Sequence, residues 1–155
     1  MQQLRLLTLL FTLFLPFPGS TQAGTDPVIP GLIPITIPGG IMIHAELADT
    51  PQKRAEGLMY REHLGADRGM LFTFLQAQPW TFWMKNTKIP LDIIWMNEKK
   101  QIVHIEQNVP ICTRTDDSCP QYRPNDESLY VLELAGGRAE SLKLQRGSKL
   151  QFKVP

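Results

Sequence analysis

The side chains best suited to chemistry in this sequence lie in one short stretch, FWMKNTKIPLD, which covers residues 82–92. An aromatic ring beside a few convergent polar groups is the usual composition of a small-ligand pocket. The stretch therefore predicts a binding site for a small polar or sugar-like molecule, with an arginine from an earlier segment as a further member. The candidate ligand-binding residues are Arg61, Trp83, Lys85, Asn86 and Asp92.

Asp92 also admits a structural interpretation, which we favour. If residues 80–85 and 91–96 form a hairpin, Asp92 points to the same side as Phe82 and Met84. A carboxylate on that apolar side needs hydrogen bonds or a charged partner, because a lone buried charge costs several kcal/mol. Backbone amides of residues 85–89 could satisfy it. The possible charged partners are Arg54, Arg61 and Lys85.

Other reactive side chains form no recognisable catalytic or metal-binding pattern. The three histidines are far apart in sequence and give no zinc-ligand pair. Scattered methionines could present thioethers to Cu(I), although such residues more often fill gaps in a core. No nucleophile elbow is present. We predict no cofactor, no metal and no catalytic residue. The methionines concerned are Met42, Met59, Met70, Met84 and Met96.

Cys112 and Cys119 lie in a turn-rich segment between Pro110 and Pro120. Two such cysteines usually pair in an oxidising compartment. A redox motif normally has Cys-x-x-Cys spacing, and a zinc knuckle needs two further ligands, which favours a structural disulfide over a reactive dithiol or half a metal site. Closing this loop removes roughly 2.5 kcal/mol of unfolded-state entropy.

Residues 1–23 indicate export. Arg5 precedes an apolar run over residues 6–17, and Thr21-Gln22-Ala23 resembles a signal-peptidase site. The run is too short to span a bilayer, which needs roughly 20 residues. We therefore expect a signal peptide cleaved after Ala23, an extracytoplasmic protein, periplasmic or secreted, and no stable membrane insertion after cleavage.

The charge balance argues against nucleic acid as a partner. The chain has 16 Lys and Arg against 15 Asp and Glu, and removing residues 1–23 with Arg5 leaves 15 against 15. A chain without net charge has no overall field to attract nucleic acid or anionic lipid.

The rest of the chain predicts a mostly β domain. Residues 24–40 contain four prolines, which predicts an extended leader or an edge segment outside the core. The single β domain is expected over residues 41–155. It begins with an alternating strand from Ile41 to Leu47, followed by a helix capped by Thr50, with Pro51 in its first position, ending near Gly57.

Further strands are predicted over residues 70–74, 80–85, 91–96, 101–106, 129–134 and 149–154, with a second short helix over residues 138–144. Residues 97–100 fit a hairpin connection. Six or seven short strands and two brief helices predict a compact antiparallel β-sandwich or barrel.

Several blocks together resemble domain-of-unknown-function family 192. In order they are ELADTPQKRAEGLMYREHL, GMLF, FWMKNTKIPLDIIWM, IEQNVP, CPQY and VLELAGG. The resemblance covers about residues 41–154 and implies a small, mostly antiparallel β-sandwich that is often exported. It implies no reaction, cofactor or catalytic residue.

The predicted function is therefore a non-enzymatic small-ligand-binding or accessory protein of the cell envelope, whose partner is a small ligand or an envelope protein. One alternative is a small enzyme acting on an envelope or extracellular polymer, with Asp92 as acid or base and Lys85 or Arg61 as electrostatic helper. A second alternative is copper handling by the methionines.

Overall fold

The computed structural model describes residues 29–114 and 116–155, which contain eight strands and two short helices. The mostly β class with two short helices is thus confirmed. In chain order the elements are β1 (Leu32–Thr36), β2 (Met42–Ala48), α1 (Pro51–Glu56), β3 (Arg68–Gln78), β4 (Phe82–Trp83), β5 (Leu91–Met96), β6 (Ile102–Val109), β7 (Gln121–Tyr122), β8 (Ser128–Ala135) and α2 (Arg138–Ser141). The predicted signal peptide lies outside the described residues.

Six of these strands form one open sheet in the order β1-β2-β3-β8-β5-β6, which is not closed into a barrel. β4 and β7 form a separate two-stranded sheet. Most strand pairs are antiparallel, as expected, and the exception is the pair β2 and β3, which are parallel. A parallel pair requires the chain to cross back before the next strand begins, and α1 with the loop that follows it makes this crossing.

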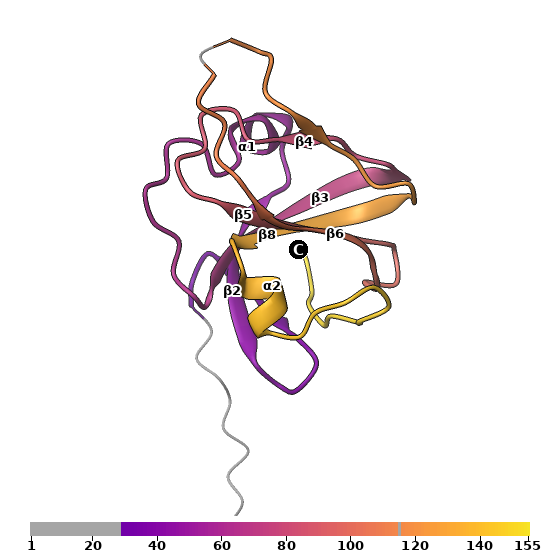
Figure 1. The fold of residues 1–155 in the computed structure, drawn as a ribbon. Coiled ribbons are helices and arrows are strands. Elements are labelled where there is room, and N and C mark those ends of the chain that lie inside the picture. Colours follow the sequence, from indigo (N-terminus) through magenta and orange to yellow (C-terminus); the bar gives the residue numbers. More distant parts are fainter. Residues whose placement is uncertain (1–28, 115) are drawn as a thin grey trace, which may run out of the picture.

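The sheet carries a hydrophobic core on each face. In β5, Ile94 and Met96 belong to the first core, whereas Ile93 and Trp95 belong to the second. This alternation follows from the two-residue period of a strand. Figure 1 shows α1 and β4 on one side of the sheet, with α2 and the C-terminal segment on the other. Both faces are covered, so β5 is buried along its whole length.

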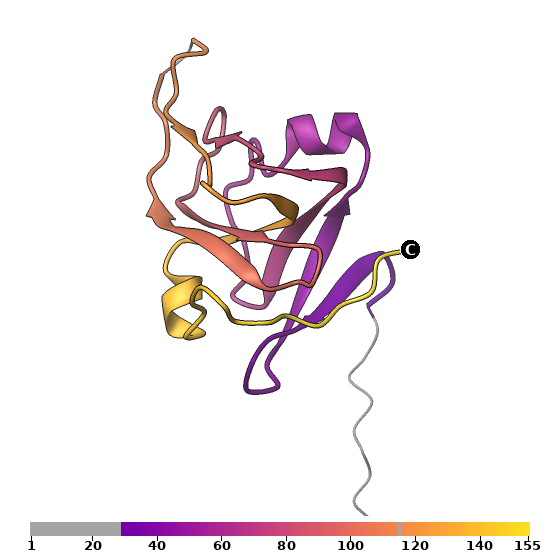
Figure 2. The same ribbon diagram turned by 90° about the vertical axis from the view of Figure 1, so that its right-hand side faces the viewer.

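β1 lies in the stretch that was predicted as a leader. It forms an edge strand, which confirms the edge interpretation, but Ile35 and Ile37 are buried in the first core. The expectation that this stretch lies outside the core is therefore wrong. Pro34 is compatible with the strand because an edge strand does not need every amide for pairing. Figure 2 shows the β1–β2 hairpin beside the C-terminal segment, where Thr36 and Gln151 form an isolated bridge.

The two helices follow their sequence signals closely. The amide of Lys53 donates to the Thr50 hydroxyl at 3.2 Å, Pro51 is in the first turn, and Gly57 caps the C-terminus, as predicted. α2 is shorter than the predicted range of 138–144, although Ala139, Leu142 and Leu144 are buried. The predicted last strand, 149–154, is represented only by isolated bridges. No helix in residues 29–114 and 116–155 is long and apolar enough to span a membrane.

Candidate functional site

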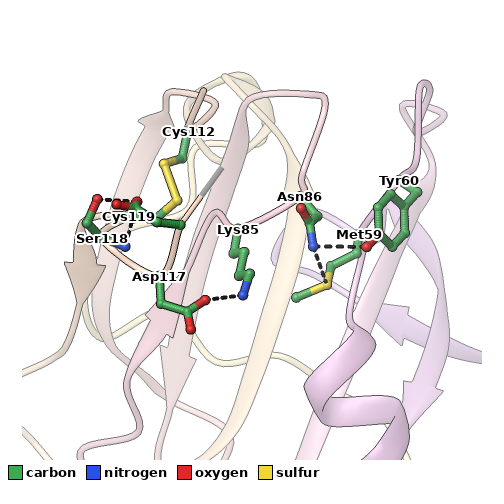
Figure 3. A network of polar contacts seen from close by, with 9 residues as sticks. Met59, Tyr60, Lys85, Asn86, Cys112, Asp117, Ser118 and Cys119 are labelled. Carbon is green, nitrogen blue, oxygen red and sulfur yellow. Dashed lines mark hydrogen bonds and ion pairs between the residues drawn. A yellow bond between two sulfur atoms is a disulfide. The ribbon is translucent and has the colours of Figure 1, made fainter. Parts of the chain in front are cut away.

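Cys112 and Cys119 form the predicted disulfide, with their Cα atoms 5.9 Å apart. The bridge closes the loop between β6 and β7, and the same loop carries Asp117. Figure 3 shows the Asp117 carboxylate facing the Lys85 ammonium, with which it forms an ion pair. The disulfide loop is thereby attached to the segment that follows β4, where two of the predicted site residues, Lys85 and Asn86, lie.

Asp92 is fully buried and saturated with hydrogen bonds. Its Oδ1 accepts from the amide of Asn108 at 2.7 Å and from that of Gly137 at 3.0 Å, while Oδ2 accepts from the amide of Ala139 at 2.5 Å. These contacts join β6 and the start of α2 to β5. The geometry favours the structural anchor, but the anchoring amides are not those of residues 85–89.

The predicted orientation of Asp92 is wrong for a topological reason. β4 pairs with β7 and not with β5, so the hairpin register that placed Asp92 beside Phe82 and Met84 does not exist. Phe82 and Met84 pack in the second core, whereas Asp92 lies on the face of Ile94 and the first core. The structure therefore separates Asp92 from the other candidate residues.

Trp83 and Lys85 line a pocket on the second face of the sheet. The Lys85 Nζ lies 5.2 Å from the centroid of the Trp83 ring, a cation–π distance. Lys85 is about one quarter exposed and Asp117 about three quarters exposed, at 27% and 74%. An ion pair this open to water contributes little to stability, so the ammonium can exchange Asp117 for another anion at small cost.

Asn86 lies beside this pocket and fixes one of its walls. Its Nδ2 donates to the Tyr60 hydroxyl at 3.0 Å and contacts the Met59 sulfur at 3.7 Å (Figure 3). The backbone carbonyl of Asn86 accepts from the backbone amide of Tyr60 at 2.8 Å. Asn86 and Tyr60 both have positive φ angles, of 56° and 63°. These reciprocal bonds tie the turn after α1 to the turn after β4.

Arg61 lies in a neighbouring hollow. Its Nη2 donates to Glu46 at 2.7 Å, and both residues are about 40% exposed. This hollow shares Glu56 and Gly57 with the Trp83 pocket but includes neither Trp83 nor Lys85. Of the five predicted residues, two thus line one pocket, Asn86 supports its wall, Arg61 is adjacent, and Asp92 is elsewhere.

The pocket opens between α1 and β4 and has a volume of about 30 Å³. That is room for one or two waters or a small polar group. Three elements contribute to it: α1 with its following turn, β4 with its following loop, and the second face of the sheet. The lining residues are Arg54, Ala55, Glu56, Gly57, Leu58, Met59, Phe72, Phe82, Trp83, Lys85, Thr87 and Glu133.

Glu133, on β8, is the residue in this pocket that the sequence analysis missed. It is 4% exposed, and its Oε2 has no hydrogen-bond partner in the structure. Burial raises the pKa of the Glu133 carboxyl to about 8. The available signal was a lone acidic residue inside the otherwise apolar strand SLYVLELA, because an acid at a buried strand position requires an explanation.

The position of Glu133 explains its raised pKa. Met70 on β3 and Ile93 on β5 are its register partners on the two neighbouring strands, and neither carries a polar side-chain group that could satisfy a carboxylate. The carboxyl is therefore protonated at neutral pH. A buried ionisable group with a strongly shifted pKa in a pocket is a typical feature of functional sites.

Among the described residues, no group of three or more His, Cys, Asp or Glu side chains is arranged to hold an ion. Of the five methionines considered for copper, only Met59 lines the Glu133 pocket. Met70, Met84 and Met96 are buried in the two cores.

Comparison with known proteins gives a family but no activity. No curated protein matches the chain. A crystal structure of a protein of unknown function from Novosphingobium aromaticivorans DSM 12444 is 31% identical, with a TM-score of 0.71, covering 88% of this chain and 99% of that one. A second structure, described as a proposed transcription regulator from Sinorhizobium meliloti 1021, is also 31% identical, with a TM-score of 0.66, covering 78% of this chain and 92% of that one. The family model DUF192, described as "Uncharacterized ACR", matches residues 34–152, and the chain therefore belongs to the DUF192 family.

Proposed function

We propose that this protein is an exported, non-enzymatic binding protein of the cell envelope that holds a small polar ligand in the pocket between α1 and β4. The observation that carries the proposal is the Glu133 carboxyl, buried at the pocket with an unpartnered oxygen. Leaving a buried polar group without a partner costs about 1–3 kcal/mol. A ligand that hydrogen-bonds to Glu133 would recover this cost.

The surroundings of Glu133 support a binding role. Phe72, Phe82 and Trp83 supply apolar and aromatic walls, while Lys85 and Thr87 add polar groups. Such a mixture of apolar lining and few polar groups is typical of small-molecule sites. The walls are preorganised by the Asn86–Tyr60 bonds, which reduces the ordering cost of binding.

A thermal-shift screen of residues 24–155 tests this proposal. The panel contains sugars, amino acids, organic acids and metal salts including Cu(I). We expect one class to raise the melting temperature of the wild-type protein, and to do so less for Trp83→Ala, which removes a pocket wall. Glu106→Gln, on β6 and outside the pocket, is the control and should retain the full shift. Absence of any stabilising class, or equal shifts for Trp83→Ala and wild type, would contradict the proposal.

Catalysis is a second candidate, and Glu133 is the group that favours it. A carboxyl with a pKa of about 8 carries a proton at neutral pH and can act as a general acid. Asp92, the acid or base of the sequence-based alternative, has both oxygens occupied by backbone amides. For an enzyme, Glu133→Gln should abolish turnover of an envelope-polymer fragment while leaving its binding intact.

Export is part of the proposal. The disulfide and the absence of a membrane-spanning helix among the described residues are compatible with an extracytoplasmic location. The intact mass of protein recovered from outside the cytoplasm should correspond to a chain that begins at Gly24. A full-length mass would contradict the predicted signal peptide.

A further inference from the structure

The hydrogen-bonding state of Glu133 restricts what the ligand can be. Met70 and Ile93 flank it on the sheet, and its burial keeps the carboxyl protonated at neutral pH. A protonated carboxyl has one O–H to donate. Because Oε2 has no partner in the structure, a ligand group placed against it gains most if it accepts this hydrogen bond.

The charges that line the pocket favour an anion. The charged residues that line the same pocket as Glu133 are Arg54 and Glu56 from α1 and Lys85 from the loop after β4. With Glu133 neutral, the lining sums to a formal charge of one positive unit, and Asp117, the ion-pair partner of Lys85 outside the pocket, supplies the balancing charge until a ligand displaces it. A cationic ligand would meet both basic groups, whereas a monoanion would balance the pocket.

The two basic residues offer their charges in different ways. Arg54 donates through Nη1 to the carbonyls of Asp49 and Thr73, at 2.8 and 3.0 Å, and its guanidinium lies 5.3 Å from the centroid of the Phe74 ring. Within the part of the chain that the structure describes, Arg54 has no carboxylate within ion-pair distance, and Lys85 forms its one ion pair with the exposed Asp117. A ligand anion can therefore compete with Asp117 for Lys85, while Arg54 contributes through its charge alone.

The size and apolar walls of the pocket limit the rest of the ligand. About 30 Å³ is room for one or two waters or a small polar group, so the carboxylate fits inside and the rest of the ligand must be short and lie toward the opening. Phe72, Phe82 and Met59 give the pocket an apolar lining, which suits a short hydrocarbon chain better than a polyol. One charged group with a short apolar tail fits all these features.

We infer that the ligand is a small organic monocarboxylate, whose carboxylate accepts a hydrogen bond from Glu133 and is balanced by Lys85 and Arg54. This inference rests on the proposed binding function and specifies the ligand's chemical class. It makes a linkage prediction. Binding of an anion that needs protonated Glu133 takes up a proton above pH 8, whereas binding of a cation by ionised Glu133 releases one below pH 8.

Calorimetry with propionate tests the inference. Titrations of residues 24–155 at pH 9, in two buffers of different ionisation enthalpy, should show uptake of about one proton per propionate bound. At pH 6 the uptake should vanish. Above pH 8 the affinity should fall about tenfold per pH unit. Propylammonium and propionamide, of similar size, serve as the cationic and neutral probes and should bind more weakly.

Single substitutions test separately the hydrogen-bond donor and the positive charge of the pocket. Glu133→Gln keeps a donor, so it should retain propionate binding while losing both proton uptake and the fall in affinity at high pH. Lys85→Gln should weaken propionate binding about tenfold, a change of about 1.4 kcal/mol. Glu106→Gln, which removes a carboxylate on β6 outside the pocket, should not weaken it. Because the Lys85 side chain is partly exposed, we expect Lys85→Gln to fold. It therefore tests the inference even if Glu133→Gln does not fold.

Three results would overturn the inference. They are tighter binding of propylammonium with proton release, equal binding of propionamide, and no propionate binding although another class shifts the melting temperature in a Trp83-dependent way. The last result would leave the proposed binding function standing. If no compound of any class binds, the proposed function itself fails.

Discussion

Asp92 holds three parts of the chain together, and its replacement should lower the free energy of unfolding. Its carboxylate accepts hydrogen bonds from the amides of Asn108, Gly137 and Ala139 at a site with no access to water. Asp92→Asn removes the charge and directs an amide N–H₂ at some of these donors. Since each unsatisfied buried donor costs about 1–3 kcal/mol, we expect a loss of at least about 3 kcal/mol in the free energy of unfolding in urea.

Asp126→Asn is the matched control for this measurement. Asp126 pairs with Arg146 at 2.7 Å, but both side chains are substantially exposed. Its loss should therefore leave the free energy of unfolding nearly unchanged. If Asp92→Asn were as mild as Asp126→Asn, the anchoring role of Asp92 would be wrong.

Glu133 should make the stability of the protein depend on pH. Its pKa is about 8 in the folded protein against an ordinary 4.5. Between these values the folded state keeps a proton that the unfolded state has lost, so stability is full below pH 4.5 and falls as pH rises toward 8. The slope is about 1.4 kcal/mol per pH unit, and it levels off above pH 8.

Urea unfolding of wild type and Glu133→Gln at intervals from pH 5 to pH 9 measures this effect. The variant has no titrating group at this position, so its stability relative to wild type should rise up to about pH 8 and then level off. Contributions from the other titrating groups largely cancel in the difference. Parallel curves would show that Glu133 is not protonated in the folded protein.

At the scale of single residues, the sequence identified part of the site. Trp83 and Lys85 were found because an aromatic residue and a cation occur within one short segment. Glu133 was missed because it lies alone on β8 and reaches the pocket only through the pairing of distant strands. Asp92 was placed on the wrong face because its orientation depends on which strand pairs with β4.

Among the elements, β3 and β8 depend on a glycine at their contact. A Cβ on Gly69 would lie 2.7 Å from the carbonyl oxygen of Glu133 and 2.8 Å from a methyl carbon of Leu134. Backbone atoms cannot move aside cheaply, so Gly69→Ala should separate the two central strands. We expect a destabilisation of about 1–3 kcal/mol or more, measured as a lower midpoint in urea.

Gly65→Ala provides a control for the added methyl group. Its Cβ would first meet the Arg68 Cγ at 3.1 Å, in a side chain that can move. A change within about 0.5 kcal/mol is expected there. Equal effects at Gly65 and Gly69 would mean that the close approach of β3 to β8 is not what Gly69 provides.

The disulfide loop should add stability without determining the fold. Cys112–Cys119 closes a short loop at the margin of the second core. A Cys112→Ser, Cys119→Ser double variant should lose about 2–3 kcal/mol and retain its β-type circular dichroism. The melting temperature of wild type in reductant should approach that of the double variant. An unfolded double variant would show that the fold requires the bridge.

Local sequence patterns predicted the elements better than their partners. β5 was found over residues 91–96 because turn residues bound a short apolar run, and α1 because Thr50 and Pro51 mark its start. The pairing of β4 with β7 and the parallel β2–β3 pair are set by contacts between distant segments. The repeat of apolar residues within one segment does not indicate which distant segment pairs with it.

For the molecule as a whole, two cores share one sheet, and β1 belongs to the folded unit. Ile35 and Ile37 are fully or nearly fully buried in the first core, at 0% and 2% exposure, and β1 pairs with β2 along its length. The sequence placed the domain start at Ile41 because prolines dominate the preceding residues. Proline density excludes a helix, but at an edge strand it does not prevent burial of the isoleucines between the prolines.

Two truncations test this boundary. A chain that starts at Ile29 keeps β1 and should unfold at the same urea midpoint as residues 24–155. A chain that starts at Ile41 loses both buried isoleucines and exposes the edge of β2. Because fully burying each isoleucine contributes about 1.5–3 kcal/mol and a small domain is stable by only about 5–15 kcal/mol, we expect the shorter chain to be largely unfolded or aggregated. Equal stability of the two chains would show that β1 is a dispensable leader and that the core begins at β2.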